Sequence, residues 1–238
     1  MRYSISDLIV EIPDAGDLVP RCSAYLCDES GEEQETDIII HTEDFRPDAW
    51  KDLTGDLYVY MESGSLFHRE LLKHNGFYLH ASAVALDGSA YLFSAPCGTG
   101  KSTHTRLWQQ VFGENAKVFN DDKPALRLLD GKWYAYGTPW CGKDHININM
   151  KVPLAGICFL KQGPVNEIRR LSSAEAAQNV LWQTMRRFQE VENLDRVLSH
   201  VDKLVQMIPV YEMECLPNEE AARLSYETMR RGAEEMGL

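Results

Sequence analysis

The sequence predicts a mixed α/β fold with a central twisted mixed sheet, a strand-rich N-terminal part and a helical C-terminal part. Three observations support this. Residues 1–62 contain short β-branched or aromatic runs between acidic and Gly/Pro breaks. From Ser172 onward the apolar spacing is mainly helical. Between these parts, residues 89–112 read as a strand, a Gly-rich loop and a helix. We expect a strand-rich extension or subdomain at 1–62 and a main domain at 63–238.

The N-terminal part is predicted to contribute strands beside the main sheet or to form a small subdomain. The runs DLIVEI, TDIIIHT and DLYVYME (56–62) each read as a strand. A helix is predicted over 65–76, because Leu66, Phe67 and Leu71 fall on one side and Gly76 stops the pattern. Residues 1–62 carry no recognisable chemical motif.

The central part alternates strands with turn signals. FYLHASAVAL (77–86) reads as one strand, Asp87-Gly88 as a hairpin turn and SAYLFS (89–94) as the return strand. A helix then runs to Gly113, and KVFNDD (117–122) is the next strand. A second hairpin turns at Asp130-Gly131, and VPLAGICFLKQ reads as a buried strand.

The C-terminal part is predicted to be helical around one strand. Ser172 and Glu175 have capping-box spacing at the start of a helix over 172–188. VYEMECL reads as a strand between Pro209 and Pro217, and residues 218–236 form the terminal helix.

Composition excludes several classes of function. The formal net charge of −12 over 238 residues disfavours a polynucleotide partner. No apolar run approaches the roughly 18–20 residues that span a bilayer. The N-terminus has no pattern of a secretion signal, and the six cysteines form no C-x-x-C pair. We therefore expect a cytoplasmic protein with reduced thiols and no membrane partner.

The loop between the central strand and helix has the pattern of a phosphate cradle. APCGTGKS (95–102) fits G-x-x-x-x-G-K-[ST] except that Ala95 stands at the first position. Glycines let backbone N–H groups converge on phosphate oxygens, and the helix N-terminus adds its dipole. The alternative is a chance Gly-rich turn. The pattern predicts a nucleotide site, with ATP favoured and GTP left open, at Pro96, Cys97, Gly98, Thr99, Gly100, Lys101, Ser102 and Thr103.

A carboxylate pair, Asp121 and Asp122, ends the strand after the cradle helix. Adjacent acids repel unless a cation or shared proton intervenes, so the pair suggests two roles. One acid would serve Mg²⁺, together with the Ser102 hydroxyl, and the other would act as a base toward an acceptor hydroxyl. A solvated turn is the alternative for the pair. His80, on the strand before the cradle, is either a core histidine or part of the site.

These motifs together resemble the catalytic domain of the HPr kinase/phosphorylase family and, more distantly, the nucleotide site of ATP-dependent phosphoenolpyruvate carboxykinase. The matching residues are LHASAV with His80, APCGTGKS and VFNDD, within residues 76–162. The resemblance implies a P-loop kinase domain. It implies that Asp121 is the general base, that Asp122 helps to bind the metal, that Lys101 serves the migrating phosphoryl group and that His80 lies beside the reacting phosphate.

Two features of that family are not matched here. The stretch YAYGTPWCGKDHININ (134–149) holds no counterpart of the Glu that also serves the metal, and the basic loop and signature that grip HPr are absent. The lack of the basic loop and of the signature therefore argues against HPr as the acceptor. Trp140, Lys143 and His145 are the candidates for substrate contact in this stretch, as a loop that closes over the acceptor or as a plain surface loop.

The main hypothesis is an ATP- and Mg²⁺-dependent kinase acting on a hydroxyl of a peptide or small protein, with Ser as the favoured acceptor. The first alternative is a kinase of a free small molecule such as an amino acid or sugar. The second is a regulator that binds nucleotide without phosphoryl transfer. HPr kinases are oligomers, but resemblance over one domain leaves the oligomeric state of this chain open.

Overall fold

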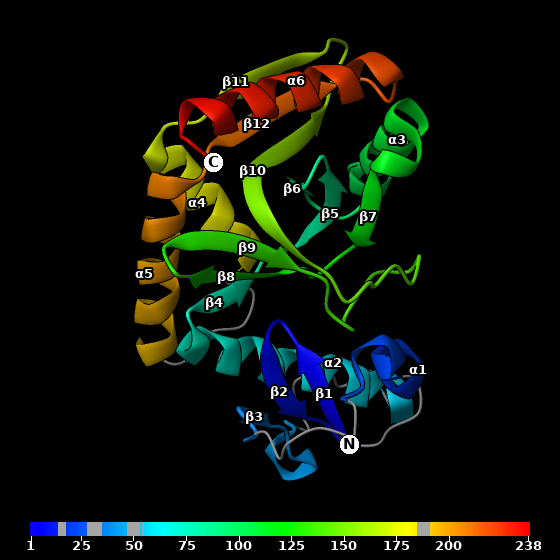
Figure 1. Cartoon of the computed structure of the whole chain (residues 1–238), viewed down its shortest axis with the longest axis vertical. Helices are drawn as coiled ribbons and strands as arrows, with labels where there is room; N and C mark the ends of the chain where they lie inside the picture. Colours follow the sequence, from blue (N-terminus) through cyan, green and yellow to red (C-terminus); the bar gives the residue numbers. More distant parts are fainter. Residues whose placement is uncertain (14–17, 28–34, 47–52, 54, 185–190) are drawn as a thin grey trace.

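The computed structural model describes residues 1–13, 18–27, 35–46, 53, 55–184 and 191–238, and the predicted mixed α/β fold is confirmed (Figure 1). Its centre is a nine-stranded sheet in which one long strand, β10, takes part in two regions. The strands, in chain order, are β4 (Gly76–Tyr78), β5 (Ala81–Leu86), β6 (Ser89–Ser94), β7 (Lys117–Asn120), β8 (Ala125–Leu129), β9 (Lys132–Tyr136), β10 (Lys151–Gln162), β11 (Glu167–Arg170) and β12 (Val210–Cys215).

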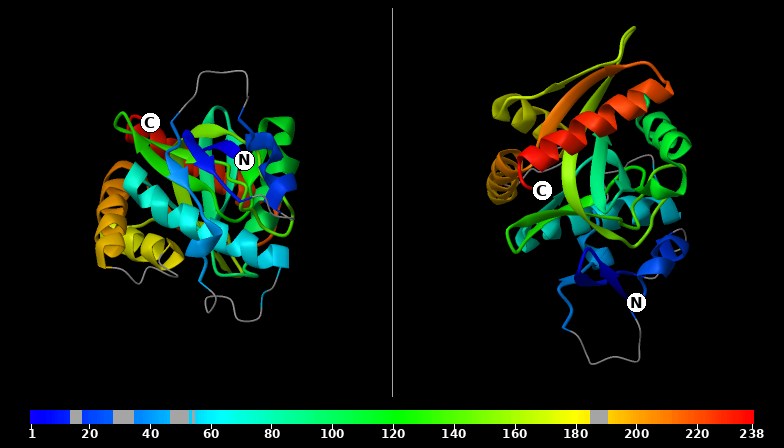
Figure 2. Two further views of the ribbon diagram at one scale, coloured as in Figure 1. Left: turned by 90° about the horizontal axis from the view of Figure 1, so that it is seen from below. Right: turned by 45° about the horizontal axis from the view of Figure 1, so that its top comes forward.

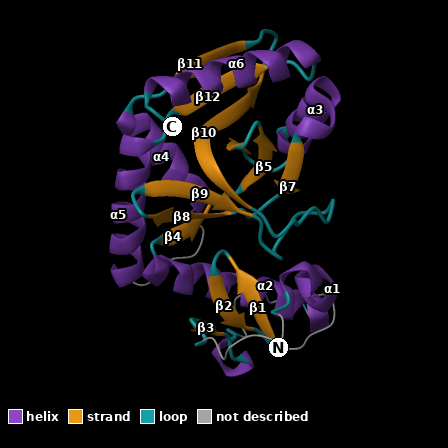
Figure 3. Cartoon of the chain, viewed as in Figure 1, coloured by secondary structure: helices purple, strands orange, loops and turns teal. Residues whose placement is uncertain are grey.

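Strand β10 curls from the lower to the upper part of the sheet (Figure 3). Its first residues, Lys151–Pro153, pair antiparallel with β9, next to β8 and β4. The rest of β10 pairs in parallel with β6 on one side and β12 on the other. On its far side, β6 pairs antiparallel with β5, and β5 pairs antiparallel with β7. This mixture of parallel and antiparallel pairs agrees with the mixed sheet that the sequence predicts.

Helices cover both faces of the upper sheet (Figure 2). Apolar side chains of α4 (Ser173–Thr184) and α5 (Val191–Met207) share one buried cluster with β4–β6 and β10. α3 (Lys101–Phe112) and α6 (Glu219–Glu235) contribute to the cluster on the other face, centred on Trp108. Among the helices within the described ranges, none combines the length and apolarity that a bilayer crossing requires.

The N-terminal part contains a small three-stranded sheet and two helices below the main sheet (Figure 1). Its core is continuous with residues of β8, β9 and the segment that follows β9. The elements are β1 (Arg2–Ile5), β2 (Leu8–Glu11), α1 (Leu18–Cys22), β3 (Ile38–Ile39) and α2 (Gly55–Leu71).

The prediction of a strand at 56–62 is wrong, because these residues form the first half of α2. Tyr60, Gly64, Phe67 and Leu71 are all buried and recur at helical spacing, so the helical face runs through residue 62. Within the run that resembles a strand, Tyr60 is the aromatic residue that belongs to this buried face, and Tyr58 is only half-buried. The predicted domain boundary at 62 consequently falls inside a continuous helix.

The single strand expected at 77–86 is divided into β4 and β5, which pair with different strands. Leu79 and His80 form the break. Leu79 N donates to the carbonyl oxygen of Pro124, and Ala81 N donates to that of Asp122, at 3.2 and 3.1 Å. His80 is thereby held at the edge of the upper sheet.

The C-terminal elements largely follow the sequence. Ser172 N donates to the Glu175 carboxylate at 3.0 Å and Glu175 N donates to Ser172 Oγ at 3.4 Å, which confirms the predicted capping box. The Asn218 side chain caps α6 by accepting from Ala221 N. The predicted helical segment 185–188 lies outside the described residues.

Candidate functional site

The loop predicted to be a phosphate cradle, called the cradle below, connects the end of β6 to the start of α3. Gly98 and Gly100 have φ values of 82° and 115°, a region in which a side chain would strain the backbone. Lys101 Nζ donates to the carbonyl oxygen of Ala95 at 3.0 Å, across the loop. The Ala95 side chain is buried in the Trp108 cluster, so the departure from glycine at this position contributes to the core.

Three strand ends meet at the cradle. β5 is antiparallel to both β6 and β7, so the start of β5 lies beside the ends of its neighbours. Ser94 Oγ donates to the carbonyl oxygen of His80 at 2.8 Å, and Ala81 N donates to that of Asp122. The structure thus brings His80 and the acid pair to the sheet edge from which the cradle begins.

Asp121 lies under the segment that follows β9. Its side chain accepts hydrogen bonds from Gly142 N at 2.6 Å and from Asp144 N at 3.2 Å, and only 6% of the residue is exposed. Burial raises the pKa of Asp121, and the hydrogen bonds from the backbone lower it only in part. A Cβ at Gly142 would lie 2.7 Å from Asp121 Oδ2, so glycine permits this close approach.

Asp122, one residue on, has the opposite electrostatic setting. Its carboxylate lies 3.2 Å from His80 Nε2 and 2.7 Å from Lys123 Nζ. Burial alone would raise the pKa of Asp122, but the His80 hydrogen bond and the Lys123 ammonium together hold it well below its usual range. His80 Nδ1 is 2.9 Å from Gln183 Oε1, so both ring nitrogens face an oxygen.

Asn120 sets the turn that separates the two acids. Its side-chain oxygen accepts from the backbone N–H groups of Asp122 and Lys123, at 3.0 and 2.7 Å. Its amide nitrogen donates to the carbonyl oxygen of Thr138 at 3.1 Å. This Asx-type turn directs Asp121 toward Gly142 and Asp122 toward His80. The Asn before the acid pair is the sequence signal that would have predicted the turn.

Ser102 and Asp122 are the two residues that the sequence predicts as Mg²⁺ ligands. Mg²⁺ is commonly held by one or two protein oxygens, with substrate phosphates and waters completing its shell. Ser102 at the start of α3 and Asp122 supply oxygens of this kind, although both oxygens of Asp122 already have partners. No cluster of three or more His, Cys, Asp or Glu side chains with metal-binding geometry occurs in the described part of the chain.

The predicted substrate residues 140, 143 and 145 occupy two different environments. Trp140 is 1% exposed, stacks on Phe67 with ring centroids 4.7 Å apart, and donates from Nε1 to Ser63 Oγ. We therefore correct its expected role: it anchors the segment to α2 and does not face a substrate. Lys143 and His145 are exposed near Asp121, since Asp144 between them donates to that carboxylate.

The N-terminal part holds the other side of this segment. Tyr60 OH donates to the carbonyl oxygen of Cys141 at 2.8 Å, and Arg21 Nη1 donates to Cys141 Sγ at 3.1 Å. Asn147 Nδ2 donates to the carbonyl oxygen of Arg21 at 2.8 Å. Residues before 62, which carry no chemical motif, thus position the segment that covers Asp121.

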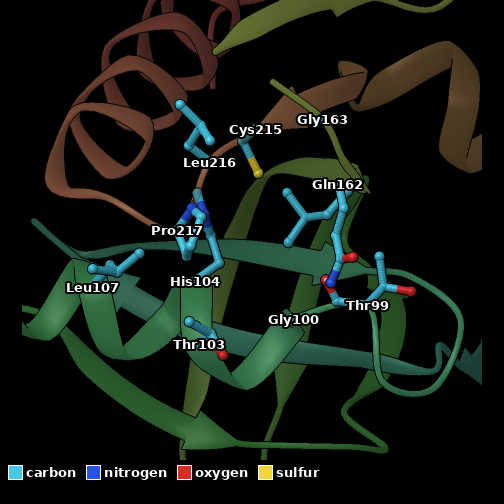
Figure 4. A pocket seen from close by; sticks show the side chains of 11 residues that line it. Thr99, Gly100, Thr103, His104, Leu107, Gln162, Gly163, Cys215, Leu216 and Pro217 are labelled. Atoms are coloured by element: carbon cyan, nitrogen blue, oxygen red, sulfur yellow. The ribbon is translucent and has the colours of Figure 1, made fainter. Parts of the chain in front are cut away.

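A pocket of about 510 Å³ lies on the opposite flank of the cradle, where Figure 4 shows it between α3 and the turn from β12 to α6. Thr99, Gly100 and Thr103 of the cradle line one side, and Cys215–Pro217 line the other. The sequence predicted the cradle side of this pocket but not the turn that faces it.

Comparison with known proteins identifies the family. Residues 56–217 match the family described as "SynChlorMet cassette protein ScmC", and the chain belongs to this family. No curated protein sequence matches the chain. Among solved structures, the HPr(Ser) kinase/phosphatase from Coxiella burnetii is similar, with 12% sequence identity and a TM-score of 0.39. That similarity covers 67% of this chain and 92% of the other.

Proposed function

We propose that the protein is an ATP- and Mg²⁺-dependent kinase that phosphorylates a hydroxyl of a peptide or small protein, with Ser as the favoured acceptor. One observation carries the proposal: a glycine-rich cradle at a helix N-terminus shares a sheet edge with a buried carboxylate of raised pKa. Nucleotide binding alone needs the cradle but has no use for a base. The pair of features suits phosphoryl transfer.

In this proposal the cradle holds the triphosphate. N–H groups of the loop and of the first turn of α3 donate to phosphate oxygens, and the Lys101 ammonium leaves the Ala95 carbonyl to neutralise the β- and γ-phosphates. Ser102 and Asp122 would hold Mg²⁺, which neutralises phosphate charge when bound. Lys123 then releases one oxygen of Asp122 and remains as a nearby cation.

Asp121 is the proposed general base. Its raised pKa brings it closer to working pH than an ordinary carboxylate, which favours proton transfer. The hydroxyl oxygen bonds to the γ-phosphorus, the bond to the β–γ bridging oxygen breaks, ADP leaves, and the hydroxyl proton passes to Asp121. Before this step, the segment containing Gly142 must release the carboxylate, because two N–H groups occupy it.

An exposed acceptor site favours a peptide over a free metabolite. A small substrate needs an enclosed pocket with an anchoring cation, whereas Lys143 and His145 are exposed residues of the segment that covers Asp121. His80 lies on the other side of Asp122 and would contact the reacting phosphate. Because the family is described as a cassette protein, products of the same cassette are the first acceptors to try.

The test is transfer of label from γ-labelled MgATP into peptide and metabolite pools. We compare the unaltered protein with Asp121→Asn and with Asp130→Asn, a matched change at the exposed β8–β9 turn. Transfer into peptide that falls about 10²-fold or more in Asp121→Asn alone supports the proposal.

Other outcomes reject parts of the proposal. Label in a metabolite fraction replaces the peptide acceptor with a small molecule. Binding of MgATP without transfer to either pool, for all three proteins, replaces the kinase with a nucleotide-binding regulator. Equal transfer by Asp121→Asn and the unaltered protein rejects Asp121 as the base.

A further inference from the structure

The pocket next to the cradle has no role in the proposed transfer step. Thr99, Gly100 and Thr103 of the cradle line it, so a ligand in the pocket would lie next to phosphates bound by the cradle. Gln162 Nε2 donates to the carbonyl oxygen of Thr99 at 3.2 Å and links the pocket wall to the cradle loop. The volume of about 510 Å³ falls within the range of roughly 300–1,000 Å³ typical of small-ligand sites.

The lining is uncharged, in contrast to the cradle. Among the described residues that line it, none is Asp, Glu, Lys or Arg. Leu107, Leu160 and Leu216 supply apolar walls, and Figure 4 shows Cys215 directed toward the pocket. His104 is neutral at physiological pH, because burial lowers its pKa to about 4, and it contacts Ser225 at 3.0 Å. The pocket therefore favours a neutral, largely apolar group.

We propose that this pocket binds the nucleoside portion of the nucleotide, with the base against Leu107, Leu216 and Pro217 and the triphosphate extending into the cradle. The proposal rests on the proposed nucleotide function and assigns a place for the base. An uncharged heteroaromatic ring joined to an anionic chain matches an uncharged pocket joined to an anion cradle. Burial of apolar ring surface supplies the affinity.

The pocket recognises the ring by shape more than by its polar edge. Two backbone donors at its rim are already used: Gly163 N donates to the carbonyl oxygen of Cys215 at 3.4 Å, and Leu216 N donates to Asn166 Oδ1 at 2.9 Å. The remaining polar side chains include Gln162, whose amide already donates to Thr99. We therefore expect little discrimination between purine bases.

Two cysteines report on the two halves of the site. Cys97 is exposed in the cradle loop and Cys215 lines the pocket. The full-length protein is alkylated with iodoacetamide at pH 8.5, and modification of each cysteine is followed by mass spectrometry. The reaction is run alone, with MgATP, and with magnesium tripolyphosphate, which has no nucleoside. At a ligand concentration about ten times Kd, an occupied site reacts about tenfold more slowly.

The proposal expects MgATP to protect both cysteines and tripolyphosphate to protect Cys97 alone. Protection of Cys97 by MgATP with unchanged modification of Cys215 rejects the pocket but leaves nucleotide binding intact. Equal protection of Cys215 by the two ligands also rejects it, because no nucleoside would be needed. Protection of neither cysteine rejects the proposed nucleotide function itself and the nucleoside site with it.

A variant provides an independent test. Leu216 is 38% exposed, so Leu216→Ser removes an apolar wall with little effect on folding. We expect MgATP affinity to fall about fivefold while tripolyphosphate affinity is unchanged. Leu198→Ser, on α5 and 42% exposed, is the matched control and should alter neither affinity. Unchanged MgATP affinity in Leu216→Ser would overturn the assignment.

Discussion

The two flanks of the cradle differ in charge: one holds charged side chains that pair with one another, and the other holds an uncharged pocket. On one flank His80, Asp121, Asp122 and Lys123 lie together, each with a charged or hydrogen-bonding partner. On the other flank the pocket is lined by uncharged residues and contains space for a ligand. One flank therefore offers charged and hydrogen-bonding groups, and the other offers mainly apolar contact. The glycine-rich loop between them is common to both.

Within the charged flank, the two neighbouring acids have pKa values that are shifted in opposite directions. Asp121 and Asp122 are adjacent in sequence, yet the pKa of one is raised, chiefly by burial, and that of the other is lowered by His80 and Lys123 against its own burial. Divergent pKa values in neighbouring acids are a common sign of separate acid–base roles. The turn made by Asn120, more than the residue type, therefore sets the electrostatic environment of each acid.

Lys101 belongs to the cradle that both flanks share, so its substitution should have the greatest consequence. In Lys101→Met, phosphoryl transfer should fall by at least about 10²-fold, because the cradle loses its cation. Affinity for MgATP and for tripolyphosphate should fall by the same factor, as measured by calorimetry. Lys132→Met, at an exposed position in β9, is the control. Unequal losses for the two ligands would break the idea of a common cradle.

A smaller effect concerns the charged flank alone. Asp122→Asn removes a carboxylate that interacts with His80 and Lys123, so the free energy of unfolding should fall by about 2 kcal/mol at pH 7. A lowered pKa stabilises the folded state above the unfolded value of 3.8, and this stabilisation is lost as the pH falls toward the folded value. Urea unfolding should therefore show the difference from wild type shrinking below about pH 4.

Asp130→Asn serves as the control for this measurement, since its carboxylate lies at a hairpin turn. A stability difference for Asp122→Asn that stays constant between pH 7 and pH 3 would contradict the assignment of the effect to this carboxylate. A constant difference would mean that Asp122→Asn lowers the free energy of unfolding through altered packing instead.

The ratio of affinities for two purine nucleotides tests the pocket alone and should deviate least. Because the rim donors at Gly163 and Leu216 are already used, Kd for MgATP and MgGTP should agree within about threefold. Competition binding with a fluorescent nucleotide measures the ratio. A preference of a hundredfold or more would show that polar groups read the base edge, which shape recognition does not provide.

The sequence predicted the parts of the site that are contiguous in the chain. The cradle, the acid pair and most strands are local patterns with a direct physical meaning. The predictions for Trp140 and for residues 56–62 fail because α2 packs against the segment that follows β9: Trp140 contacts Ser63 and Phe67, and Tyr60 bonds to Cys141. Gly64 lets α2 approach the Trp140 ring, since a Cβ there would lie 2.7 Å from Cδ1. That fit is invisible in either segment alone.

Other site residues could not be predicted because they come from distant elements. Gln183 on α4 reaches His80, and Cys215–Pro217 face the cradle only through the pairing of β12 with β10. Lys123 follows the acid pair directly, but only the Asn120 turn shows that it pairs with Asp122. Periodicity and spacing carry no information about such long-range contacts.

The long strand β10 also bears on the order in which the chain folds. The edge that carries the cradle and the acids consists of β5, β6, α3 and β7, which follow one another between residues 81 and 120. The pocket requires β10 to pair in parallel with β6 and β12, which lie far away along the chain. Contacts between distant residues form slowly because long loops must close first. We therefore expect the sheet edge with the cradle and the acids to form early in folding, and the pocket beside the cradle to form late.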